Sequence, residues 1–248
     1  MFTSWYQLGL SPTRQDDWWK GSVFAVDSLN MVAGGFVDYL GNQMIARNNV
    51  FGVGGNAPVV ATADTGLQYG RGINLPPGAI LASSIGALSP LLLTEDFTFD
   101  YWYRQTTNAL PLGASLLTCY PNLQVATTYT NRFWLAAGIG GTGNATTANL
   151  SLWNNAAPPV VIGTTPHGLA TTAWQHVAVV YQKSTGTIRI YKGGALLTTM
   201  THTLAAVTGT VQIGLTNDKS TTGCVERVRF RTGALYTGSS FSLSALYP

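Results

Sequence analysis

From residue 97 onward, short segments in which apolar and polar residues alternate recur along the chain, and they constrain its fold more than any other feature. The clearest examples are residues 97–104 (FTFDYWYR), 174–181 (WQHVAVVY) and 225–231 (VERVRFR). A two-residue period is typical of a half-buried β-strand, because successive side chains point to opposite faces of the sheet. The pattern therefore predicts an all-β chain of antiparallel strands.

The intervening sequence supports the same fold class. Further strands are expected at residues 67–75, 115–119, 124–128, 132–137, 149–153, 160–162 and 211–215, with Gly, Asn and Pro clusters between them. Residues 177–182 and 187–192 form the clearest hairpin, around the turn at residues 183–186. No long amphipathic helix is expected. Regularly spaced short strands indicate an antiparallel two-sheet β-sandwich or jelly roll, and 248 residues suit one such domain.

Charged residues are scarce: they make up 9% of the chain, against about 25% in a typical soluble domain. The surface must therefore consist largely of Thr, Ser, Asn, Gln and Gly. Such a surface indicates either an extracellular, sugar-rich setting or extensive cover by partner proteins, because interface cores are poor in charge. The thinly spread net charge of +3 predicts no nucleic-acid partner, and no apolar run is long enough to predict a membrane span.

The only clustered cations are Arg227, Arg229 and Arg231, which alternate along one expected strand. The strand period places them on one face, opposite Val228 and Phe230. We expect this face to be a solvent-exposed row.

Residues 1–60 differ in texture from the remainder and are expected to form an irregular N-terminal arm, with the sandwich at residues 61–248. The arm carries the aromatic residues Trp5, Tyr6, Trp18 and Trp19. Because exposed tryptophans are costly to leave in water, the arm should either pack along the sandwich or anchor on a neighbouring subunit.

Several of these segments together resemble the laminin G-like, concanavalin A-like jelly-roll family over residues 60–248. The resemblance rests on residues 97–102 (FTFDYW), 174–180 (WQHVAVV), 188–194 (IRIYKGG), 211–214 (VQIG), 225–229 (VERVR) and 234–236 (ALY). Residues 233–241 (GALYTGSSF) are similar to versions of this fold in bacteriophage structural and tail proteins. The resemblance implies two curved antiparallel sheets that present loops or a concave face to glycans or protein partners.

Some glycanases share this general fold, so the acidic residues need to be considered. Glycoside hydrolysis usually requires two carboxyl groups about 5 to 9.5 Å apart, and the nearest acidic set is Glu95, Asp96 and Asp100. Asp96 and Asp100 would share a strand face with backbones about 13 Å apart. The Glu-x-Asp-x-x-Glu arrangement of the family's glycanases is missing. We expect no catalysis, and a structural role for His176 and for Glu226, the latter as an orienting or surface carboxylate.

No cofactor or metal is expected. Residues 138–143 (GIGGTG) fit a dinucleotide-binding pattern, but a strand-like segment follows where a helix is required. Cys119 and Cys224 are expected to be buried thiols, with a disulfide as the alternative. The family sometimes binds calcium, and only Asp218 is placed to contribute; a solvated turn is the favoured role for it.

For glycan binding, the best candidate group is Trp153 with Asn154 and Asn155, at the end of an expected strand. Sugars are commonly held by an aromatic face beside amide side chains. The competing role for Trp153 is a rim residue that caps the core.

Two functions remain open. The first is a non-enzymatic bacteriophage virion structural protein (capsid decoration, fibre or tail component). It would be homo-oligomeric, contact other virion proteins, assemble in the host cytoplasm and reach host surface glycans as a further ligand. The low charge, the aromatic arm, the start at Met1 without a secretory signal pattern and residues 233–241 favour it. The alternative is a secreted or surface carbohydrate-binding lectin module, located outside the cell.

Overall fold

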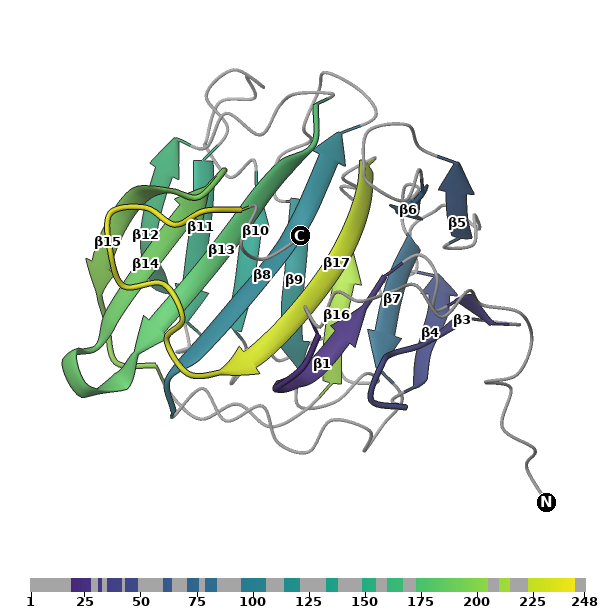
Figure 1. Cartoon of the computed structure of the whole chain (residues 1–248), viewed down its shortest axis with the longest axis horizontal. Helices are drawn as coiled ribbons and strands as arrows, with labels where there is room; N and C mark the ends of the chain where they lie inside the picture. The colour runs from purple at the N-terminus through teal and green to yellow at the C-terminus, as the bar shows by residue number, and fades with distance from the viewer. Residues whose placement is uncertain are drawn as a thin grey trace.

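The computed structural model describes residues 19–27, 31–32, 35–41, 43–48, 60–63, 71–75, 79–83, 95–105, 114–120, 133–137, 149–154, 160–166, 173–204, 210–214 and 223–243. These residues form two antiparallel sheets, which Figure 1 shows as layers facing each other. No helix within these ranges is long and apolar enough to cross a membrane. The predicted all-β, two-sheet sandwich is confirmed.

Eight strands form the first layer, called sheet A. In order across the sheet they are β15 (Ala195–Thr201), β14 (Thr187–Lys192), β13 (Gln175–Gln182), β8 (Phe97–Gln105), β17 (Gly223–Thr232), β6 (Arg71–Leu75) and β5 (Val60–Ala63), and β1 (Ser22–Val26) also pairs with β17.

Nine strands form the second layer, called sheet B. Their order is β12 (Val160–Pro166), β11 (Asn149–Asn154), β10 (Phe133–Ala137), β9 (Ala114–Tyr120), β16 (Thr210–Gly214), β7 (Ala79–Ser83), β4 (Gln43–Asn48), β3 (Gly35–Val37) and β2 (Met31–Val32).

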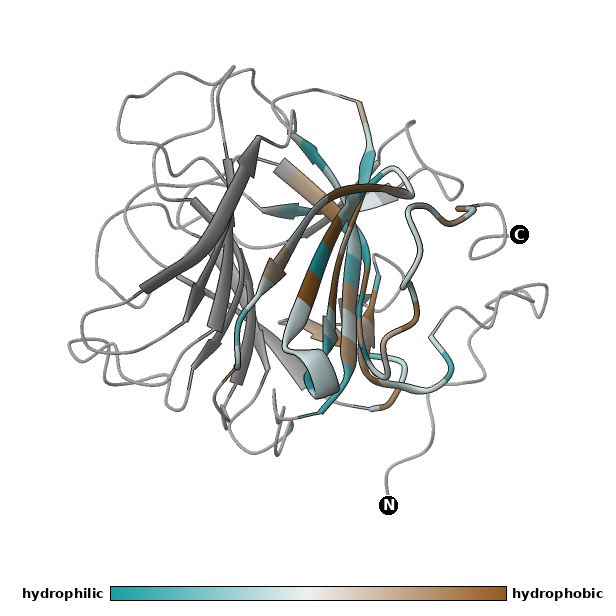
Figure 2. Ribbon diagram, turned by 90° about the vertical axis from the view of Figure 1, so that its left-hand side faces the viewer, coloured by the Kyte–Doolittle hydropathy of each residue, from teal (hydrophilic) through white to brown (hydrophobic). Residues whose placement is uncertain are grey.

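The alternation along β8 divides sheet A into two faces. Phe97, Phe99, Tyr101 and Tyr103 are all buried and lie on one face, where the Phe97 ring lies 4.9 Å from that of Phe230 between centroids. Each buried aromatic side chain of this kind contributes about 1.5 to 3 kcal/mol to folding. The same alternation of hydrophobic and hydrophilic residues is visible along the strands of this layer in Figure 2. This aromatic face is the core side of sheet A.

The predicted hairpin is confirmed, and β14 has the predicted bounds. Its turn contains the short 3₁₀ helix η4 (Lys183–Thr185), which ends at Gly186 in the left-handed region with φ 63°. The Gly186 N–H donates to the carbonyl of Lys183 at 3.1 Å. Glycine suits this position because it adopts positive φ without a Cβ clash.

The interpretation of residues 1–60 as an irregular arm is wrong for the described part of that segment. β1 pairs with β17, and β2, β3 and β4 are strands of sheet B. The strand β1 escaped prediction because four of its five residues are buried, so it has no clean alternation. Trp19 stacks on Tyr39 at 5.5 Å. Trp5, Tyr6 and Trp18 lie outside the described residues.

The predicted solvent-exposed arginine row is also wrong. Arg227 and Arg229 are only 3% and 1% exposed, Glu226 is fully buried, and Arg231 is half-buried. The ladder between β17 and β8 shifts register between Glu226 and Arg229, and Arg227 has a positive φ of 49°, which together mark a β-bulge. Residues 224–230 of β17 are all buried, so both faces of this part of the strand are covered.

Candidate functional site

Residues 233–243, called here the C-terminal strap, follow β17 and pass across the face of sheet A opposite its aromatic core side. Figure 1 shows this yellow segment in front of β14 and β13. The Leu196 N–H donates to Ser239 O at 3.0 Å, and the Phe241 N–H donates to Gly194 O at 2.8 Å. These bonds, with a bridge between Ala195 and Ser240, fasten the strap to the beginning of β15.

An ion pair lies buried beneath the strap. Arg229 donates to Asp100 twice, from Nε to Oδ1 at 2.6 Å and from Nη2 to Oδ2 at 2.7 Å. The Tyr236 hydroxyl of the strap donates to Asp100 Oδ2 at 2.9 Å and accepts from Arg229 Nη2 at 2.8 Å. Both carboxylate oxygens of Asp100 are therefore engaged, which leaves it poorly suited to act as half of a glycosidase pair with Asp96.

His176 is fully buried beside this ion pair, with Nε2 3.9 Å from Asp100 Oδ2. Its ring makes T-shaped contacts with the rings of Trp102 and Phe241, at centroid distances of 5.4 and 5.7 Å. Burial lowers the pKa of His176 to about 4; Asp100 opposes this shift and Arg229 adds to it. The imidazole is therefore neutral near pH 7 and belongs to the packing under the strap.

This burial predicts a pH-dependent stability. Between pH 6.5 and 4 the unfolded chain protonates His176 while the folded chain does not, so folding loses stability as the pH falls through that window. The full loss is about 3 kcal/mol, and above pH 6.5 the histidine contributes no pH dependence. Urea unfolding at pH 7.5, 6.0 and 5.0 should show a steeper decline for the wild type than for His176→Gln. Parallel profiles for the two proteins would contradict this expectation.

Aromatic packing holds the rest of the strap. Tyr236 and Phe241 stack with centroids 3.7 Å apart, and both rings meet Tyr191 of β14 edge-on. The Tyr191 hydroxyl lies within donating distance of two strap carbonyls, 3.0 Å from Tyr236 O and 2.8 Å from Gly238 O. Side chains of the strap therefore cover this part of sheet A.

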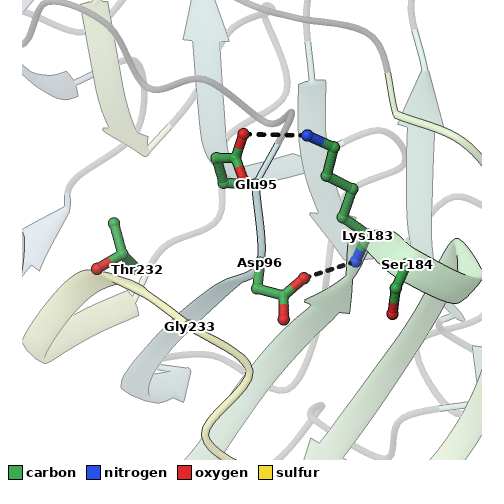
Figure 3. A pocket seen from close by; sticks show the side chains of 6 residues that line it. All are labelled: Glu95, Asp96, Lys183, Ser184, Thr232 and Gly233. Atoms are coloured by element: carbon green, nitrogen blue, oxygen red, sulfur yellow. Dashed lines mark hydrogen bonds and ion pairs between the residues drawn. The ribbon is translucent and has the colours of Figure 1, made fainter.

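An open depression of about 800 Å³ lies beside the strap, at the end of sheet A. It is formed where β8 begins, where η4 turns and where β17 ends, as Figure 3 shows. The residues lining it are Glu95, Asp96, Lys183, Ser184, Thr232 and Gly233.

The polar groups of this depression are partly paired with one another. Lys183 Nζ donates to Glu95 Oε1 at 3.0 Å, and the Lys183 backbone N–H donates to Asp96 Oδ1 at 2.8 Å. The Lys183 and Glu95 side chains are 51% and 67% exposed, so this ion pair contributes little to stability. The carboxylates, ammonium and hydroxyls can exchange hydrogen bonds with ligand hydroxyls, but the lining residues include no aromatic ring.

The residues predicted to bind glycan come from the end of β11. Trp153 and Asn154 are consecutive residues of this strand, so the strand pleat places them on opposite faces of sheet B. Asn155 lies outside the described residues. The glycan site stays a prediction, and only Trp153 or Asn154 can contribute on any one face. Sequence reasoning did not find the depression, because its residues come from three distant segments.

The described residues include both cysteines but not Asp218. Cys224 is buried in β17 of sheet A, and Cys119 belongs to β9 of sheet B. Asp218 lies outside the described residues. Among the residues that the structure describes, no three His, Cys, Asp or Glu side chains gather as a metal-binding group.

Comparison with known proteins identifies the fold. No protein family and no curated protein matches the chain. Domain 4 of AbnA, an extracellular arabinanase of Geobacillus stearothermophilus solved in complex with arabinotriose, superposes with a TM-score of 0.63 at 16% identity, covering 87% of this chain and 94% of that domain. The chain has a jelly-roll β-sandwich fold.

Two toxin binding domains show the same likeness over part of their length. The binding domain of Paraclostridial Mosquitocidal Protein 1 superposes with a TM-score of 0.58 at 12% identity. The ligand-binding domain of botulinum neurotoxin serotype D, solved with N-acetylneuraminic acid, gives 0.57 at 11%. Each alignment covers 87% of this chain but only 50% and 48% of the toxin chains, respectively. At these identities the likeness concerns the fold alone.

Proposed function

We propose that this chain is a non-enzymatic carbohydrate-binding module that acts outside the cell. The observation that carries the proposal is the end-to-end correspondence with domain 4 of AbnA, whose structure holds arabinotriose. A match over 87% of one chain and 94% of the other means that the two share the whole β-sandwich rather than one motif. Fold alone does not specify a ligand, so the residues must support the same conclusion.

The composition fits a sugar-binding surface. With 9% charged residues, the exterior must be dominated by hydroxyl and amide side chains, which can both donate to and accept from sugar hydroxyls. The absence of catalysis is part of the proposal. Asp100 is neutralised by Arg229 in the interior, which removes it as a partner for Asp96 in glycoside hydrolysis.

The virion hypothesis, with its virion partners and homo-oligomer, rested on the low charge, the aromatic arm, the start at Met1 without a secretory signal pattern, and residues 233–241. In the structure, residues 233–241 form most of the strap. Tyr236 and Phe241 stack on each other, and Tyr236 hydrogen-bonds to Asp100 within the same chain. Intrachain packing therefore accounts for the pattern without a partner, and for that reason we favour the carbohydrate-binding module.

Glycan binding provides the direct test. We expect the full chain to bind at least one class of oligosaccharide on an array that includes arabinans and sialylated glycans, and to show a saturable isotherm by calorimetry with the best ligand. Prolonged incubation with that ligand should release no new reducing ends. Failure to bind any sugar on the array would overturn the proposal, and release of reducing ends would overturn its non-enzymatic part.

A further inference from the structure

Two tryptophans on neighbouring strands of sheet B occupy directly opposed positions. The antiparallel register between β10 and β11 pairs Trp134 with Trp153, and no register shift interrupts this ladder. Directly paired residues of an antiparallel sheet share one face, with Cβ atoms about 4.5 to 5.5 Å apart. Two aromatic positions 19 residues apart in the sequence are thus brought side by side.

The same register extends this pair into a row across four strands. Trp134 is paired with Thr118 of β9, and Thr118 is paired with Gln212 of β16. With neighbouring strands about 4.8 Å apart, the row from Trp153 to Gln212 spans about 14 Å. That length suits a short oligosaccharide lying across the strands.

The adjacent row of paired residues indicates whether the tryptophan row lies on the inner or the outer face of sheet B. It consists of Leu152, Leu135, Leu117 and Ile213, which are paired with one another by the same three ladders. All four are aliphatic, as the inner face of a sandwich requires. Each precedes or follows a member of the tryptophan row by one residue, so the pleat assigns the tryptophan row to the opposite, outer face.

We propose that the row of Trp153, Trp134, Thr118 and Gln212 on the outer face of sheet B is the carbohydrate-binding surface of this protein. The inference rests on the proposed function and deepens it. Indole faces suit the C–H patches of a sugar ring, while a hydroxyl and an amide both donate to and accept from its hydroxyls. The row carries no charged residue, which favours a neutral sugar. The strap covers part of the outer face of sheet A, where Phe241 and Tyr236 pack on Tyr191.

The depression at Glu95 and Lys183 is the competing site, and substitutions separate the two. The probe is arabinotriose, or the array glycan that binds best, titrated into the full chain by calorimetry. We expect Trp134→Ala and Trp153→Ala each to weaken binding by about tenfold or more. Trp19→Ala, which removes the same residue type beside Tyr39, and the double variant Glu95→Gln/Lys183→Met should bind as the wild type does.

A second measurement covers variants that lose stability. The double variant Trp134→Phe/Trp153→Phe keeps aromatic residues at both positions, and its melting temperature shows whether it is folded. Addition of the sugar should change the tryptophan fluorescence of the wild type, and this change should be lost in the folded double variant. Retention of the change, or unaltered affinity in Trp134→Ala and Trp153→Ala, would overturn this inference and leave the proposed function standing. A wild type that binds no sugar would instead overturn the proposed function.

Discussion

Replacing Arg229 with methionine is expected to lower the free energy of unfolding by about 3 to 5 kcal/mol. The substitution leaves the fully buried carboxylate of Asp100 without its bidentate partner. The hydroxyl of Tyr236, 2.9 Å away, would remain as a donor to Asp100. Isolated buried charge is costly because the interior cannot replace the hydration that the group loses on folding. Urea denaturation at pH 7.5 measures the change.

A double substitution distinguishes this cause from a simple loss of packing. In Asp100→Leu/Arg229→Met neither charge remains, so the double variant should be more stable than the sum of the two single losses predicts. Strictly additive losses in the two single variants and the double variant would contradict the ion-pair explanation. Tyr236→Phe, which removes one hydroxyl from the cluster, should cost about 1 to 3 kcal/mol.

Replacing Gly194 with alanine should lower the free energy of unfolding by about 2 to 4 kcal/mol. Gly194 has φ of +82°, and a Cβ at this position would overlap the carbonyl oxygen of Phe241 in the strap. The backbone there is held in place, since the Phe241 N–H donates to Gly194 O. The strap must therefore shift away from sheet A to admit the methyl group. Unfolding in urea and limited proteolysis of the strap report the two consequences.

The neighbouring glycine is a matched control. Gly193 also has positive φ, at +58°, but a Cβ built there meets nothing within 4 Å. Gly193→Ala should therefore lower the free energy of unfolding by about 1 to 2 kcal/mol, because alanine is strained in the left-handed conformation. The strap should remain as resistant to protease as in the wild type. Equal effects of the two substitutions would show that the strap is not packed against Gly194 as described.

The alternation of apolar and polar residues was sufficient to predict strands that have one buried face and end at a recognisable turn. β14 begins and ends at the predicted residues, because TIRIYK alternates and Gly186 and Gly193 bound it. The same rule missed β1, whose burial on both faces removes the alternation. It also misjudged Arg229, whose burial depends on Asp100, 129 residues earlier in the chain.

The proposed binding row of sheet B was likewise predictable from the sequence only in part. Trp153 is conspicuous in the sequence as an aromatic residue followed by two asparagines. Its pairing with Trp134 cannot be recognised in the sequence, because the length of the connecting segment does not determine the register between the two strands. The strand pleat also places Trp153 and Asn154, which the sequence analysis grouped as one site, on opposite faces of sheet B.

The sequence by itself determined that this protein is an all-β sandwich with a polar exterior that carries few charges. Strand periodicity can be read from neighbouring residues, and the scarcity of charge can be read from the amino-acid composition. Only the tertiary structure decided that Asp100 and Arg229 meet, that residues 233–243 cover part of one face of sheet A, and that Trp134 is paired with Trp153. These contacts join segments far apart in the chain, and their geometry depends on which strands pair and in which register.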